Sequence, residues 1–101
     1  MNEKKMLSLL GLAAKAGKTV SGEFATEKSV KARLARLVIL AGDASANTRK
    51  KFRNMCACYP TPVMEISDKE TLGKAIGKEL RSCMAVEDEG FAAALRRLAG
   101  S

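Results

Sequence analysis

Apolar residues in the first segment of the chain recur at helical spacing and predict an amphipathic helix. Four of them fall at i, i+3, i+4 and i+7: Met6, Leu9, Leu10 and Ala13. Asn2 is a suitable cap for this helix, and Gly17 should end it. Residues 19–20 then predict a short extended segment, and Ser21 is a good N-cap for a second helix over residues 22–32.

A continuous apolar run without alternation occupies residues 37–41, which is typical of a strand covered on both faces. Asp43 and Ser45 then offer caps for a third helix. The apolar face of that helix comprises Phe52, Met55, Cys56 and Tyr59. Pro60 and Pro62 forbid any further helix beyond this point.

The last third of the chain repeats the alternation of strand and helix. Ser67, with Glu70 three residues later, has the capping-box pattern of a short helix that ends near Gly77. The acidic run 87–89 lies where it matches the dipole of a final helix, which carries the apolar residues Phe91, Leu95 and Leu98. Two strands are expected around these helices, at residues 63–66 and 82–86.

The regular alternation of helices and strands predicts an α/β fold, a three-layer α-β-α sandwich in which helices cover both faces of one sheet. A chain of 101 residues is the size of one folded domain, so we expect residues 1–101 to form a single domain. Its 47% hydrophobic content is sufficient for a core without metal or disulfide support.

The net positive charge of the chain indicates a class of partner. Lys and Arg number 18 against 11 Asp and Glu, which gives a net charge of +7. A surplus of this size attracts polyanions and favours nucleic acid as the partner, although a plain solubility surplus is the alternative.

The sequence argues against catalysis and against a metal site or other cofactor. It contains no histidine, and no serine or cysteine is paired with an obvious base. Cys56 and Cys58 are too closely spaced for the usual zinc ligand pairs. We interpret these two and Cys83 as buried or half-buried thiols in a reducing, cytoplasmic compartment.

Two segments resemble known motifs, a signal peptide and a phosphate-binding loop, but do not fit them. The apolar run after Lys4 and Lys5 resembles a signal peptide, but its helical periodicity and the basic residues that follow favour a helix of the folded domain. The segment 11–19 resembles a phosphate-binding loop, but five residues separate its glycines, and a helix rather than a strand precedes it. No apolar run is long enough to span a membrane, so no membrane partner is expected.

The start of the second predicted helix is the strongest candidate for binding a phosphate chain. Its free amide groups can face a phosphate, and Gly22 permits close approach. Lys18 flanks the entrance, and Lys28 and Lys31 lie on the following turns. The loop 77–82 is a second candidate, because an apolar tip between cations can pack against an unstacked base. The few aromatic residues do not follow the strand pattern of base-stacking modules.

Four stretches together resemble the kink-turn-binding ribosomal proteins of the L-seven-Ae and L-thirty-e type, most closely their small bacterial YlxQ-like branch. The stretches are LGLAAKAGKTVSGE (10–23), ARLVILAGDAS (35–45), DKETLGKAIG (68–77) and DEGFA (88–92). The resemblance implies an α-β-α sandwich with a mixed four-stranded sheet. It also implies recognition of the kink-turn, a sharply bent RNA helix with tandem sheared G·A pairs.

The resemblance assigns roles to individual residues. Gly22 and Lys28 match the glycine-led helix start and its lysine, while Phe24 and Ala25 replace the family's Asn-Glu pair. In the second loop, Glu79 and Leu80 match an acidic-apolar pair that packs on flipped-out nucleotides. Glu23 is one position away from the replaced pair and can partly substitute for it if the helix start shifts. Charge and position add three further expected RNA-binding residues: Lys18, Lys31 and Arg81.

The expected function is therefore a non-catalytic RNA-binding protein that stabilises kink-turn RNA. The expected partner is a kink-turn or ribosomal RNA, with the ribosome or another ribonucleoprotein as the wider assembly. The alternative is a protein-interaction accessory of the translation machinery that binds RNA weakly or without specificity.

Overall fold

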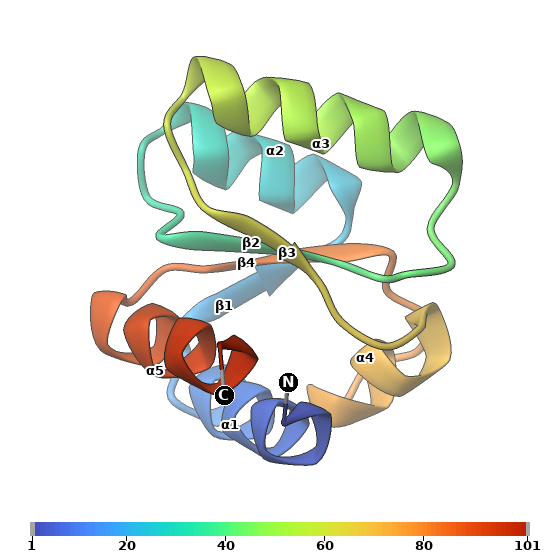
Figure 1. Ribbon diagram of the computed structural model, residues 1–101, viewed down its shortest axis with the longest axis vertical. Coiled ribbons are helices and arrows are strands. Elements are labelled where there is room, and N and C mark those ends of the chain that lie inside the picture. The colour runs from blue at the N-terminus through green and yellow to red at the C-terminus, as the bar shows by residue number, and fades with distance from the viewer. Residues whose placement is uncertain (1, 101) are drawn as a thin grey trace.

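A computed structural model describes residues 2–100 and contains the predicted alternation of helices and strands (Figure 1). Along the chain the elements are α1 (Glu3–Lys15), β1 (Thr19–Ser21), α2 (Glu23–Lys31), β2 (Leu37–Leu40), α3 (Ala46–Cys58), β3 (Val63–Glu65), α4 (Lys69–Ala75), β4 (Cys83–Val86) and α5 (Glu89–Ala99). Most boundaries lie within one or two residues of those expected from the sequence.

The four strands form one mixed sheet in the order β1-β4-β2-β3. Strands β2 and β3 are parallel, whereas β4 runs antiparallel to both of its neighbours. Figure 1 shows α2 and α3 on one face of the sheet and α1, α4 and α5 on the other. This arrangement confirms the predicted α-β-α sandwich with a mixed four-stranded sheet.

The core consists of two clusters, one on each face of the sheet. In β2, Leu37 and Ile39 pack with the helices α1, α4 and α5, whereas Val38 and Leu40 pack with α2 and α3. All four side chains are fully buried. Strand residues alternate between faces, and both faces are covered here, so the run shows no polar position.

Two predicted helix caps are confirmed, and a third cap lies in the acidic run expected at the start of the last helix. Asn2 accepts a hydrogen bond from the Lys5 amide at 3.3 Å, and Ser45 accepts one from Thr48 at 3.1 Å. Asp88 caps the last helix by accepting from the Phe91 amide at 2.9 Å. The side chain of Asp43, the other candidate cap of α3, instead accepts a hydrogen bond from the Lys69 amide at the start of α4.

Two predicted serine caps are wrong. Ser21 is the last residue of β1 and pairs with Met84, so the N-cap of α2 is Gly22. Ser67 has a positive φ of 56°, and Asp68 caps α4 by accepting from the Thr71 amide at 2.8 Å. In both cases the backbone of the serine pairs with another part of the fold, so the residue after the serine is the cap.

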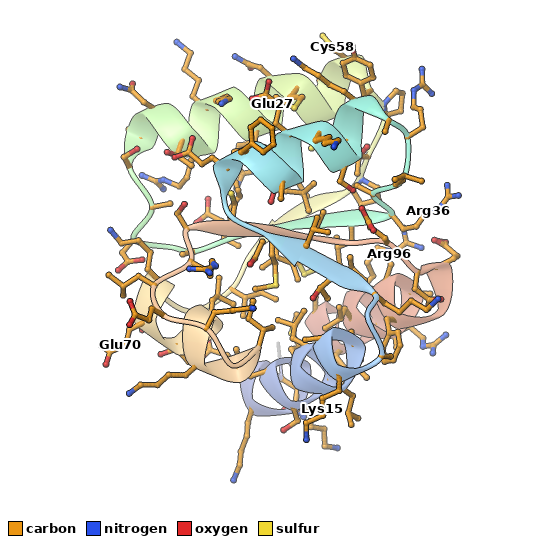
Figure 2. All side chains as sticks on the ribbon, turned by 180° about the vertical axis from the view of Figure 1, so that it is seen from behind. Lys15, Glu27, Arg36, Cys58, Glu70 and Arg96 are labelled. Carbon is orange, nitrogen blue, oxygen red and sulfur yellow. The ribbon has the colours of Figure 1, made fainter. Side chains whose placement is uncertain are left out.

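The cysteines differ from the prediction at one position. Cys56 and Cys83 are buried, and burial raises the pKa of both thiols above the ordinary value. Cys58, however, is exposed. It follows Cys56 by two residues in α3, which turns it by about 200° to the outer face of the helix; Figure 2 shows it projecting from that helix.

Within residues 2–100, no helix has the length and apolar character needed to cross a membrane.

Candidate functional site

Gly22 forms the joint between β1 and α2. Its φ of 91° lies in the region that favours glycine, and this conformation turns the chain from strand to helix in one step. The amide of Gly22 donates to the Cys83 carbonyl at 3.0 Å, which anchors the joint to β4. A Cβ at this position would meet no atom within 4 Å, so the space beside Gly22 is open to a ligand.

The connection between α4 and β4 lies against the same joint. The Nε of Arg81 donates to the Ser21 hydroxyl at 2.9 Å, and its Nη1 donates to the Leu80 carbonyl at 2.8 Å. The guanidinium has more N–H donors than these two bonds use. Leu80 is 61% exposed at the tip of the connection. The structure therefore brings the two candidate sites of the sequence together into one surface, which we call the joint surface (residues 21–24, 28 and 79–81).

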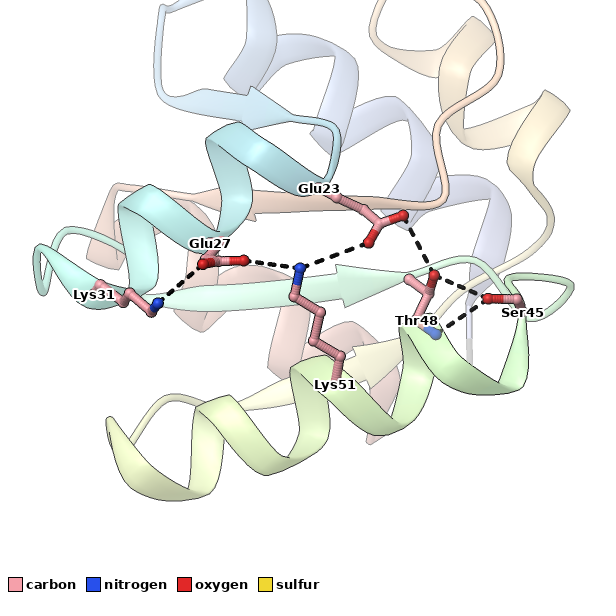
Figure 3. Close-up of polar contacts among 6 residues, drawn as sticks. All are labelled: Glu23, Glu27, Lys31, Ser45, Thr48 and Lys51. Carbon is pink, nitrogen blue, oxygen red and sulfur yellow. Dashed lines mark hydrogen bonds and ion pairs between the residues drawn. The ribbon is translucent and has the colours of Figure 1, made fainter.

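The two acidic side chains of α2 contact α3, although Glu23 belongs to the segment that forms the joint surface (Figure 3). Glu27 accepts from Lys51 at 2.8 Å and from Lys31 at 2.9 Å. Glu23 accepts from the Thr48 hydroxyl at 3.4 Å and lies 3.8 Å from the Lys51 Nζ. The hydrogen bonds from Lys51 and Lys31 lower the pKa of Glu27 to about 2. Of the residues expected to bind RNA, Glu23 is therefore held against α3, and Lys31 is paired with Glu27 within α2.

Glu27→Gln is expected to remove an acid-sensitive part of the stability. Because the pKa falls from 4.5 to about 2 on folding, the carboxylate stabilises the fold fully above pH 4.5 and loses this effect toward pH 2. Urea unfolding at about pH 6 and about pH 3 should therefore show a smaller loss of stability in the variant than in the wild type.

The matched control is Glu70→Gln, which removes a more exposed carboxylate paired with a single lysine, Lys74. We expect this control to retain the acid sensitivity of the wild type. Identical pH dependence in the wild type and Glu27→Gln would contradict the role of the Glu27 ion pairs.

Lys28 differs from Lys31 in that it has no ion-pair partner among residues 2–100. It follows Phe24 by four residues, so the two share a stripe of α2. Both side chains are exposed, and Phe24 is 83% exposed. The outer stripe of α2 thus presents an apolar ring and a free cation beside the open glycine.

Lys18 lies apart from the other predicted residues. It precedes β1, and its carbonyl accepts from the Glu87 amide at 2.8 Å, whereas Gly22 is at the other end of the strand, next to Cys83. The structure therefore does not bring Lys18 to the joint surface. It places Glu79, Leu80 and Arg81 there, together with Gly22.

A basic groove adjoins the joint surface along the free edge of β1, the strand in front in Figure 2. Its volume is about 640 Å³, and its lining includes Ser21 and Gly77. Three lysines line it: Lys15, Lys74 and Lys78. Lys74 pairs with Glu70 at 3.2 Å, while Lys15 and Lys78 have no ion-pair partner in the part of the chain that is described. Sequence reasoning missed Lys15 and Lys74 because only the packing of α1 beside α4 brings them together.

Together these features suit the binding of a polyanion that carries apolar faces. Free cations lie beside exposed apolar side chains and an open backbone joint, and such a surface can hold phosphates and unstacked bases at once.

Comparisons with known proteins identify one family. Residues 4–96 match the model of the ribosomal protein L7Ae/L30e/S12e/Gadd45 family. The chain is 44% identical over 92 residues to RNA-binding protein YlxQ of Bacillus subtilis (strain 168), covering 91% of this chain and 92% of that protein. It is 35% identical over 97 residues to RNA-binding protein YlxQ of Enterococcus faecium, covering 96% and 93% of the two chains.

Solved structures share the fold. A protein with unknown function from Bacillus halodurans C superposes with a TM-score of 0.92 at 41% identity, covering 96% of this chain and 98% of that one. A Giardia lamblia 15.5kD RNA binding protein superposes with a TM-score of 0.82 at 21% identity, covering 96% and 83%. The second likeness, at this identity, concerns the fold alone.

Proposed function

The chain belongs to the ribosomal protein L7Ae/L30e/S12e/Gadd45 family, in its YlxQ-like branch, and on this premise we propose that it is a non-catalytic, single-domain RNA-binding protein that recognises and stabilises kink-turn RNA. Two relatives in that branch carry the name of RNA-binding proteins. The net charge of +7 supports a polyanionic partner.

One observation carries the proposal, namely the union of the glycine-led start of α2 with the connection that bears Leu80. The bond from Arg81 to Ser21 and the bond from Gly22 to Cys83 join two segments that are far apart in sequence. An RNA that bends sharply can contact both segments at once, because they form one surface.

In the proposed complex, Gly22 and the first amides of α2 meet the RNA backbone, and Lys28 reaches the G·A pairs. Leu80, with Glu79 beside it, contacts an extruded base. Cations at the margin hold phosphates: Arg81, Lys31, Lys18 and the lysines of the basic groove. Glu23 acts by holding the start of α2 to α3 through Thr48 and Lys51. A preformed surface of this kind selects the kinked population of the RNA and stabilises it.

The replacement of the family's Asn-Glu pair by Phe24 and Ala25 changes which groups of the protein can contact the G·A pairs. Neither side chain can donate or accept a hydrogen bond, so these positions make no polar contact with the G·A edges. In this proposal the bent shape, Lys28 and the backbone at Gly22 therefore provide the selectivity.

The test is a titration of two RNAs at one salt concentration. A kink-turn hairpin should bind at least about tenfold more tightly than a plain duplex of equal length, which corresponds to about 1.4 kcal/mol. Equal affinities would reject kink-turn recognition and favour the alternative, an accessory of the translation machinery that binds RNA without specificity.

Lys28→Ala is expected to weaken the kink-turn complex by about 1–3 kcal/mol if the lysine contacts a base edge. Lys4→Ala is the matched control, because it removes the same charge from α1 on the opposite face of the sheet. Filter binding at several salt concentrations measures both variants. If the two variants have equal effects, the loss is one of net charge, and the assignment of Lys28 is wrong.

A further inference from the structure

Phe24 is the most exposed large apolar side chain in the described part of the protein, at 83% of its surface. The other two phenylalanines behave differently: Phe52 is fully buried, and Phe91 packs against the core. A single exposed apolar residue needs no explanation, so exposure of Phe24 alone assigns no role. A second feature is required.

Leu80 supplies the second feature. Leu80 is 61% exposed and lies on the connection between α4 and β4. Arg81 of this connection donates a hydrogen bond to Ser21, which is three residues before Phe24 in the chain. The pairing of Gly22 with Cys83 holds the same two segments together from the other side. The two exposed apolar side chains therefore belong to segments that meet at one backbone joint, although 56 positions separate them in the sequence.

The charges around Phe24 indicate what its ring contacts. The stripe of α2 that carries Phe24 also carries Lys28, which has no ion-pair partner among residues 2–100. The acids of the helix, Glu23 and Glu27, are turned toward Lys51 on α3 (Figure 3). On α2 the ring is thus bordered by the free cation of Lys28 and not by a free carboxylate. The carboxylate of the joint surface without an ion-pair partner among residues 2–100 is that of Glu79, on the connection next to Leu80. The cations Lys28 and Arg81 favour a ligand that combines a flat apolar face with negative charge.

We propose that Phe24 is a base-stacking residue, whose ring packs against an unpaired nucleobase of the bound RNA next to the G·A pairs that Lys28 reaches, while Arg81 holds a neighbouring phosphate. This inference rests on the proposed function and deepens it. Where the family has a residue that hydrogen-bonds the G·A edge, this chain makes a stacking contact. Stacking tolerates any base, because every base has a π face. The RNA preference of this chain therefore depends on where an unpaired base is placed and less on its identity.

Phe24→Ala measures the contribution of the ring. Stacking on one base corresponds to about a 5- to 150-fold change in affinity, so the variant should bind the kink-turn hairpin more weakly by a factor in this range. Phe24→Leu keeps an apolar side chain but removes the π face, and it should fall between the wild type and Phe24→Ala. Leu12→Ala is the control, because Leu12 is 58% exposed on α1, across the sheet.

Phe24→Trp reports the contact directly. The chain contains no tryptophan, so this variant has a single indole fluorophore. It should retain the affinity of the wild type, and its emission should be quenched when the RNA saturates the protein, since a stacked base quenches indole. Phe24 is exposed, so we expect all of these variants to fold, and far-UV circular dichroism with urea unfolding checks this.

The outcomes separate this inference from the proposed function. If the wild type binds neither the kink-turn hairpin nor a duplex, the proposed function fails and the stacking contact fails with it. If the wild type binds RNA but Phe24→Ala binds equally well, or the indole is not quenched at saturation, the stacking role is overturned and RNA binding stands. Unchanged RNA affinity with loss of self-association in Phe24→Ala would assign the ring to a protein contact and would also overturn the stacking role.

Discussion

Gly73→Ala is expected to destabilise the protein by about 2 kcal/mol or more and to displace the Leu80 connection. A Cβ at residue 73 would overlap the backbone carbonyl of Glu79. The close approach is held by the Lys78 amide, which donates to the Gly73 carbonyl at 2.8 Å. Alanine gains at most about 1 kcal/mol of helix propensity over glycine, whereas overpacking against backbone costs about 1–3 kcal/mol and occasionally more.

Gly100→Ala is the matched control for this substitution. Its Cβ would lie 3.7 Å from the nearest atoms, which is ordinary contact, so we expect little change. Urea unfolding measures both variants. RNA titration below the unfolding transition should show weaker binding only for Gly73→Ala, because Glu79 and Leu80 move with the strained turn. If Gly73→Ala is as stable as the wild type, the connection can move away from α4 without cost, and the predicted overlap with Glu79 does not strain the fold.

Phe52→Ala should lower the free energy of unfolding by about 3–5 kcal/mol, the range for removing a buried aromatic side chain. Phe52 is fully buried between α3 and the sheet. The same cluster contains Val30 of α2 together with Val38 and Leu40 of β2. A total stability of about 5–15 kcal/mol is usual for a domain, so this one change removes a large part of it.

The effect should extend to the candidate site, because the cluster around Phe52 supports α2, whose start carries Gly22. Hydrogen exchange of the α2 amides should increase in Phe52→Ala more than that of α5, which packs on the opposite face of the sheet. Asn54→Ala, an exposed change on the same helix, should remain within about 0.5 kcal/mol of the wild type. If Phe52→Ala lowers the free energy of unfolding by less than about 1 kcal/mol, the side chains around residue 52 must close the cavity, and the expected support of α2 by Phe52 is wrong.

Most of the fold could be predicted because its signals are local. Apolar spacing identified the first, third and last helices, cap residues indicated the second and fourth, and the uninterrupted run 37–41 identified a strand with two covered faces. The errors arose where a local preference has two uses. Serine caps helices and also occupies strands and turns, so Ser21 and Ser67 were assigned by propensity, whereas backbone pairing decided them.

The candidate site was predictable only in part. The helix start with Gly22 and Lys28 and the loop with Glu79 and Leu80 followed from residue type and position, and the family resemblance assigned their roles in RNA binding, which remain predictions. The contacts of Glu23 with Thr48 and Lys51 were not predictable, because nothing in either helix specifies that α2 and α3 are neighbours. The pairing of Lys31 with Glu27, in contrast, follows the i, i+4 spacing within α2. The sequence pattern argued against base stacking by Phe24, because the aromatic residues do not follow the strand pattern of stacking modules. The exposure of Phe24 and of Leu80 in the structure is what suggests that role.

The sequence by itself determined the order of helices and strands, the sandwich and the basic charge, since these depend on residue type and on spacing within single elements. Only the tertiary structure decided which cations are free and which segments meet. Ser21 and Arg81 are 60 residues apart in the chain, yet they share a hydrogen bond of 2.9 Å because the sheet order places β1 beside β4. Short-range backbone geometry sets periodicity, whereas the partners of a charge depend on which elements the packed sheet brings together.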